Sequence, residues 1–202
     1  MWKRTAQPIR SLPPHYREAE RMRVTEPRRL FWLNVLSLIP LAGSGLVIGG
    51  LLAIYNAADA PLVIDALPQS IPSTVGLLLV LLVLPLHEWI HGQAIRYYGH
   101  KPRYGARFLV LFATADGALF RRDEFVRIAL APLVGISLIG MVVMAFLPSG
   151  LAQWAALAVM MNAAGAIGDI WMSAVALRFA PSALIRDEED SMRVFVAAPP
   201  TA

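Results

Sequence analysis

The sequence predicts an all-α polytopic membrane protein with four transmembrane helices and a small cytoplasmic β-hairpin-like insertion between the second and the third. Three observations predict this fold class. Of the 202 residues, 57% are hydrophobic and only 16% are charged, a mixture far more apolar than that of an ordinary soluble domain. Four stretches reach the roughly 20 residues that are needed to cross the hydrocarbon core of a bilayer. The basic residues avoid the middles of all four stretches.

The four predicted spans cover residues 30–55, 71–97, 125–147 and 151–179. Lys and Arg are concentrated in residues 1–29, in residues 96–127 and from residue 178 onward, and the other two connections contain none. Because basic loops stay on the cytoplasmic side during insertion, we expect a multi-pass protein of the plasma or inner membrane with both termini in the cytoplasm. The predicted domains are a basic cytoplasmic tail at 1–29, a four-span membrane domain at 30–179 and a cytoplasmic tail at 180–202.

The connection between the second and third spans has a β-like pattern. Residues 103–120 (RYGARFLVLFATADGALF) alternate aromatic and β-branched residues and contain Asp116-Gly117, a turn signal, so they are read as a short hairpin. An amphipathic segment on the membrane surface is the alternative. The basic N-terminal arm adjoins a predicted bilayer and lacks a recognition motif, so it favours anionic lipid headgroups and not nucleic acid.

Ionisable residues inside two of the spans are the strongest functional signal. A charged group at the centre of a span costs about 2.5 to 3.5 kcal/mol on insertion scales. His87, Glu88 and His91 nevertheless lie in the second span and Asp169 lies in the fourth. The absence of cysteine excludes disulfides, thiolate nucleophiles and cysteine-based zinc sites, so a metal would need His or carboxylate ligands.

The HEWIH sequence has the spacing of a zinc-binding helix. His87 and His91 are four positions apart in the sequence. This spacing places both imidazoles on one helix face, where they can share a zinc ion. Glu88 lies about 100° further around the helix, beside the metal and not on it, which is the position of a general base. The alternative is a pair of intramembrane histidines that only hydrogen-bond neighbouring helices.

A catalytic zinc needs a third protein ligand, and Asp169 is the best candidate by depth. At 1.5 Å per residue, His87 to His91 lie about 24 to 30 Å from the outer start of their span and Asp169 lies about 27 Å from the start of its own. The alternative for Asp169 is a carboxylate capped by backbone or paired with Arg. Asn162 shares the face of Asp169 two turns earlier, so it could orient substrate or a ligand, or simply pack helices.

The segments HEWIHGQAIRYYGHKPRYGA, LAPL at 130–133 and NAAGAIGD together resemble the membrane zincin peptidases, which are integral-membrane metalloproteases with an HExxH motif and are similar in design to site-2 proteases. The resemblance implies zinc at His87 and His91, Glu88 as base and Asp169 at the place of a Gly-Asp on a later span. Asn162 is followed by Ala163, whereas site-2 proteases usually have Asn-Pro at this point.

The function expected from these observations is an intramembrane zinc metallopeptidase. It would hydrolyse peptide bonds of a membrane protein or peptide near the cytoplasmic face, with a zinc-activated water and Glu88 as general base. A non-proteolytic metal-binding membrane adaptor is the main alternative. An ion-coupled transporter would use the same charges, but four spans without a visible repeat disfavour it.

Overall fold

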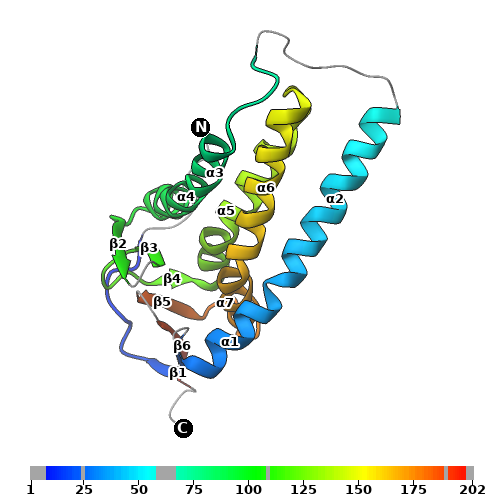
Figure 1. Cartoon of the computed structure of the whole chain (residues 1–202). Helices are drawn as coiled ribbons and strands as arrows, with labels where there is room; N and C mark the ends of the chain where they lie inside the picture. The colour runs from blue at the N-terminus through cyan, green and yellow to red at the C-terminus, as the bar shows by residue number, and fades with distance from the viewer. Residues whose placement is uncertain (1–7, 24–25, 58–66, 108–109, 189–190, 199–202) are drawn as a thin grey trace. The chain divides into compact units, whose positions relative to one another are not determined.

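The computed structural model describes residues 8–23, 26–57, 67–107, 110–188 and 191–198, and Figure 1 shows their arrangement into elements. The described part contains seven helices and six strands. The helices are α1 (Pro27–Leu36), α2 (Leu38–Ala57), α3 (Ser73–Leu81), α4 (Val83–Tyr97), α5 (Arg122–Met144), α6 (Ser149–Gly165) and α7 (Ile167–Ala176). The strands are β1 (Tyr16–Arg23), β2 (Arg103–Arg107), β3 (Val110–Thr114), β4 (Phe120–Arg121), β5 (Leu184–Glu188) and β6 (Ser191–Ala197).

The predicted all-α class is wrong, because the chain also forms an antiparallel sheet in the order β1-β6-β5-β4. Three of these strands come from residues 16–23 and 184–197, which the sequence analysis treated as tails. The burial of β6 explains the pairing: Ser191, Met192, Val194 and Phe195 are buried, and Arg193 between them is only partly exposed. Strands this short, flanked by Arg and Glu, resemble polar tails until their distant partners are known.

A hairpin does lie between α4 and α5, but its turn is not the predicted one. The strands β2 and β3 pair in a register that runs from Arg103 opposite Thr114 to Arg107 opposite Val110. The connection at 108–109 lies outside the described residues. The turn at Asp116-Gly117 instead follows β3 and leads toward β4, and Gly117 has a positive φ of 66° there, a conformation that favours glycine.

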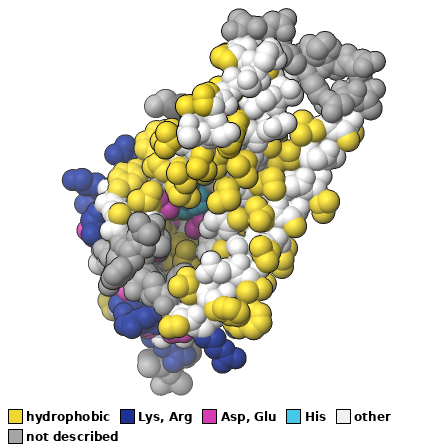
Figure 2. Space-filling view, viewed as in Figure 1, with side chains coloured by type: hydrophobic (Ala, Val, Ile, Leu, Met, Phe, Trp, Pro, Cys, Tyr) yellow, Lys and Arg dark blue, Asp and Glu magenta, His cyan; other side chains and the backbone are white. Residues whose placement is uncertain are grey.

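Three helical stretches in the described residues are long and apolar enough to cross a membrane, at Pro27–Ile54, Ser73–Tyr97 and Arg122–Met144. A fourth span results if α6 and α7, which are bent by 40° at a break, are counted together. The predicted fourth span is therefore not one continuous helix. Figure 2 shows hydrophobic side chains projecting outward from the long helices, among them the exposed Leu46, Ile54 and Ile139, as expected of surfaces that face lipid.

The chain divides into two compact units, each built from several segments. The first unit contains all six strands, and one face of its four-stranded sheet forms a core with helices. Ile185 and Val194 of the sheet are buried in the same cluster as Ile95 of α4, Phe125 of α5 and Val175 of α7. The helix segments that carry the predicted site residues after position 87 are therefore anchored to the sheet.

The second unit consists of residues 33–87 and 132–167. Its helix α6 packs against both α2 and α3. Close approach of α3 depends on Gly76, because a methyl group at this position would overlap the indole ring of Trp154. A residue without a side chain thus lets these two helices meet through a large aromatic ring.

Gly76→Ala should lower the free energy of unfolding by about 1 to 3 kcal/mol, because the added methyl group overpacks the contact with Trp154. The measurement is denaturant or thermal unfolding of the purified protein in detergent. Gly49→Ala in α2 is the matched control, since a methyl group there meets nothing within 4 Å. Equal stability of the two variants would contradict the packing described here.

Candidate metal centre

The two histidines of the HExxH sequence occupy one face of α4. His87 and His91 are buried, with 9% and 7% of their surfaces exposed, and Glu88 beside them is half-buried. Their spacing of one turn is a property of the continuous helix and holds wherever the rest of the chain lies. The sequence folds locally in this way because α4 continues the apolar α3, with Leu82 still helical between them.

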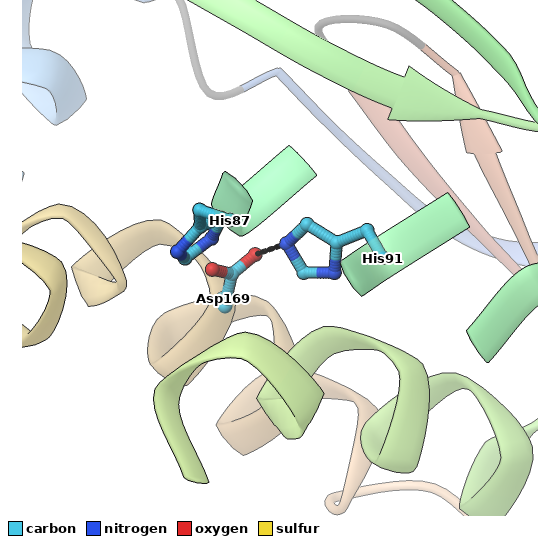
Figure 3. Close-up of side chains that lie close together, drawn as sticks. All are labelled: His87, His91 and Asp169. Carbon is cyan, nitrogen blue, oxygen red and sulfur yellow. Dashed lines mark ion pairs between the residues drawn. The ribbon is translucent and has the colours of Figure 1, made fainter. Parts of the chain in front are cut away.

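Asp169 meets this face from the first turn of α7. Its Oδ1 atom lies 3.5 Å from Nε2 of His91, as the dashed line in Figure 3 marks. His87, His91 and Asp169 each offer one ligand atom, and these atoms all lie within 4.8 Å of one another. The break after α6 matters here, because it places the carboxylate at a helix N-terminus, where the helix dipole favours negative charge.

Hydrogen bonds show which ring nitrogen of each histidine is held by a neighbouring acceptor. Nδ1 of His91 lies 2.9 Å from the carbonyl oxygen of Ile128, which can only accept, so this nitrogen carries the proton. Nδ1 of His87 lies 2.9 Å from Oδ1 of Asn162. The amide of Asn162 is oriented by its Nδ2, which donates to the carbonyl of Pro132 at 3.3 Å. In both imidazoles Nδ1 is therefore the nitrogen that carries a proton, and Nε2 is the nitrogen that can bind a metal.

Pro132 contributes to the hydrogen bonds of both histidines. It lies inside α5 and has no amide hydrogen, so the carbonyl of Ile128, four residues earlier, loses its helical donor. This is the carbonyl that accepts the hydrogen bond from His91. The carbonyl of Pro132 itself holds Asn162, which in turn holds His87.

This set of donors fits a zinc ion. Two imidazole nitrogens and one carboxylate oxygen form a recognised catalytic zinc set that leaves the fourth position open. Zinc bonds of 2.0 to 2.1 Å in tetrahedral geometry place ligand atoms roughly 3.3 Å apart, close to the 3.5 Å between His91 and Asp169. Each imidazole also has the partner on its other nitrogen that metal-ligating histidines almost always have. Asp169 also places a carboxylate oxygen beside Nε2 of His91.

A family model described as Putative zincin peptidase matches residues 80–184. The chain belongs to this family. The match begins just before the HExxH sequence and ends at the first residue of β5, so it includes every residue of the metal centre. No curated protein and no solved structure matches the chain. Membership supports a metallopeptidase with zinc as its metal.

The structure brings together the three residues predicted as ligands, and it places the predicted orienting residue Asn162 against His87. Their binding of an ion stays a prediction. The sequence analysis did not identify the carbonyl of Ile128 as the partner of His91. It also did not identify Pro132 as the residue that removes the helical donor of this carbonyl. A proline in the middle of an apolar helix was the available signal, because such a residue always leaves one carbonyl without its helical partner.

The residue after the HExxH sequence also positions the hairpin. A side chain on Gly92 would overlap the phenol of Tyr104 in β2. Gly92 lies one turn after Glu88, on the same face of α4. The glycine thus lets β2 approach the helix beside the predicted base Glu88. This contact explains why a glycine follows the HExxH sequence and why a tyrosine lies in β2.

Asp169→Ala should reduce bound zinc from about one equivalent per chain to a small fraction of it, because two imidazoles alone are an incomplete set. Metal analysis of the purified protein measures this. Asp123→Ala is the control, because Asp123 is a half-exposed carboxylate at the start of α5. Full zinc occupancy in Asp169→Ala would show that this residue is not a ligand.

Pro132→Ala should weaken zinc binding about tenfold, the usual effect of disturbing a group that orients a ligand. The alanine amide would compete with His91 for the carbonyl of Ile128 and would loosen the ring. Competition with a chromophoric chelator measures the affinity. Pro72→Ala, at the exposed N-cap of α3, should have no effect because a proline at the start of a helix replaces no helical hydrogen bond. An unchanged affinity in Pro132→Ala would refute the role given to this proline.

Proposed function

We propose that the protein is an intramembrane zinc metallopeptidase that hydrolyses peptide bonds near the cytoplasmic face. One observation carries the proposal: two imidazoles on one turn of α4, each held through Nδ1, offer ligand atoms that lie within 4.8 Å of each other and of a carboxylate oxygen of Asp169. Membership of a zincin family supports it. The long apolar helices support the membrane setting, and the distribution of basic residues supports the orientation.

Zinc held by His87, His91 and Asp169 would supply a Lewis acid that polarises the substrate carbonyl and acidifies a water. Glu88 then takes the proton of the attacking water and delivers it to the nitrogen of the leaving amine. Its position suits this task, because it adjoins the first ligand but points about 100° away around the helix. Asn162 and the carbonyl of Ile128 keep both rings in the required tautomer throughout.

We further propose that the substrate is a membrane protein or peptide in an extended conformation. An intact helix shields its carbonyls within its own hydrogen bonds, so a substrate helix must unwind before its peptide bond can be cut. The hairpin of β2 and β3 could receive such a chain as an added strand. Contact of Tyr104 with Gly92 supports this, because it holds β2 beside the helix face of Glu88.

Glu88→Gln should reduce peptidase activity by about 10² to 10⁴ while zinc content stays unchanged, because the substitution removes the proton acceptor and no ligand. Cleavage of β-casein, an unfolded probe that needs no unwinding, and metal analysis of the same sample measure the two properties. Glu26→Gln is the control, since Glu26 is an exposed residue that precedes α1. Unchanged cleavage by zinc-loaded Glu88→Gln would exclude this mechanism, and a preserved cellular role without cleavage would favour a metal-binding adaptor.

A further inference from the structure

Asp187 of β5 lies on the face of the sheet that packs against helices. Side chains alternate between the two faces of a strand, so Asp187 shares its face with Ile185. Ile185 is fully buried in the core formed with α4, α5 and α7. The partner of Asp187 across the sheet is Met192, which is also fully buried in this core. The carboxylate of Asp187 is therefore directed toward the helices, although its strand belongs to the C-terminal segment.

This carboxylate lies within electrostatic reach of the metal centre. Burial raises the pKa of Asp187 to about 7, the nearby charges of Asp169 and Glu88 act in the same direction, and that of His91 opposes them. In the described part of the chain, the only hydrogen bond of Asp187 is to its backbone oxygen, from Oγ1 of Thr114. Asp187 is half-buried, and carboxylates whose pKa is raised in a recess are characteristic of functional sites.

Asp187 lines a recess of about 370 Å³ at the end of β5. The other residues that line it are Arg103, Thr114, Asp116, Gly117, Arg186 and Glu188. The recess therefore lies between the end of the β2–β3 hairpin and the end of β5, and all of its residues belong to the first unit. It is large enough for an extended polar side chain, and Asp187 is one of the residues that line it.

The other charged groups of the recess already have partners. Arg103 pairs with Asp116 at 2.9 Å, and Glu188 pairs with arginines of β1 and β6. Arg186 projects from the opposite face of β5 from Asp187, where its guanidinium lies over the ring of Phe195, although its Nε has no hydrogen-bond partner in the described residues. On the side that faces the helices, the unpaired charge is negative.

We propose that Asp187 is a substrate-binding residue whose carboxylate receives a Lys or Arg side chain of the substrate, next to the peptide bond that is cut. This inference rests on the proposed peptidase function. Membrane proteins carry basic residues at the cytoplasmic ends of their spans, so a substrate presented at that face brings such a side chain to the site. A cation in the recess lowers the pKa of the carboxylate and gives it the counter-ion that the fold does not provide.

The test uses three sets of peptide hydroxamates, in which the hydroxamate chelates the zinc and one of the two adjoining residues is Lys, norleucine or Glu. Isothermal titration calorimetry measures their binding to the zinc-loaded full chain in detergent at pH 8. The best Lys probe should bind about tenfold tighter than the norleucine probe, as expected for one hydrogen-bonded charge pair. Asp187→Asn should abolish this preference, and Asp187→Glu should retain part of it. Asp123→Asn, at an exposed carboxylate outside the recess, should leave it unchanged.

Equal binding of the Lys and norleucine probes to the wild-type protein would overturn the inference. Tighter binding of the Glu probe would overturn it as well, and would assign the recess to Arg186 and an acidic group. If no hydroxamate binds, both the proposed zinc site and this inference are wrong. If all hydroxamates bind equally well, only the inference is wrong. Thermal unfolding of each variant shows that it is folded. If Asp187→Asn does not fold, Asp187→Glu becomes the test. Complete loss of the preference for Lys in folded Asp187→Glu would count against the proposal.

Discussion

The missing amide hydrogen of Pro132 is the constraint on which the metal centre depends. A carbonyl inside an apolar helix has no water to bond, so the carbonyl that a proline leaves without its helical donor must find another one. Here the carbonyl of Ile128 finds Nδ1 of His91. The next step uses the carbonyl of Pro132 itself, which orients the amide of Asn162 and through it the ring of His87. One residue of α5 thus determines the tautomers of both imidazoles on α4.

Charge balance explains why the remaining ligand is a carboxylate that comes from another helix. A divalent cation held only by neutral imidazoles would leave a buried net charge, which is expensive in a poorly solvated interior. Asp169 and Glu88 together compensate a zinc ion, and they do so from different elements, α7 and α4. The break after Gly165 contributes to this arrangement, because it starts a new helix whose N-terminal dipole stabilises the carboxylate of Asp169.

The parts of the site that follow from local geometry could be predicted from the sequence. Spacing alone places His87, Glu88 and His91, and counting residues along a span brings Asp169 to the same depth. The four-stranded sheet could not be predicted, because its strands are short, rich in charge and paired across the length of the chain, as in the pairing of Tyr16 with Ala197. The hydrogen bond of His91 to Ile128 was also out of reach, since it depends on how α5 lies against α4 and not on any pattern within either helix.

The sheet, which the sequence did not reveal, gives the helices of the first unit a core that excludes water, which the proposed membrane setting alone would not provide. Lipid tails are as apolar as the side chains they solvate, so no hydrophobic force holds membrane helices in register. In the first unit, Ile95 of α4, Phe125 of α5 and Val175 of α7 are buried in one core with Ile185 and Val194 of the sheet, where burial from water does provide such a force. These are the three helices that carry His91, Ile128 and Asp169. A metal centre that requires atoms to be placed within tenths of an ångström thus has its helix ends fixed from the sheet side, and the same sheet brings Asp187 within electrostatic reach of them.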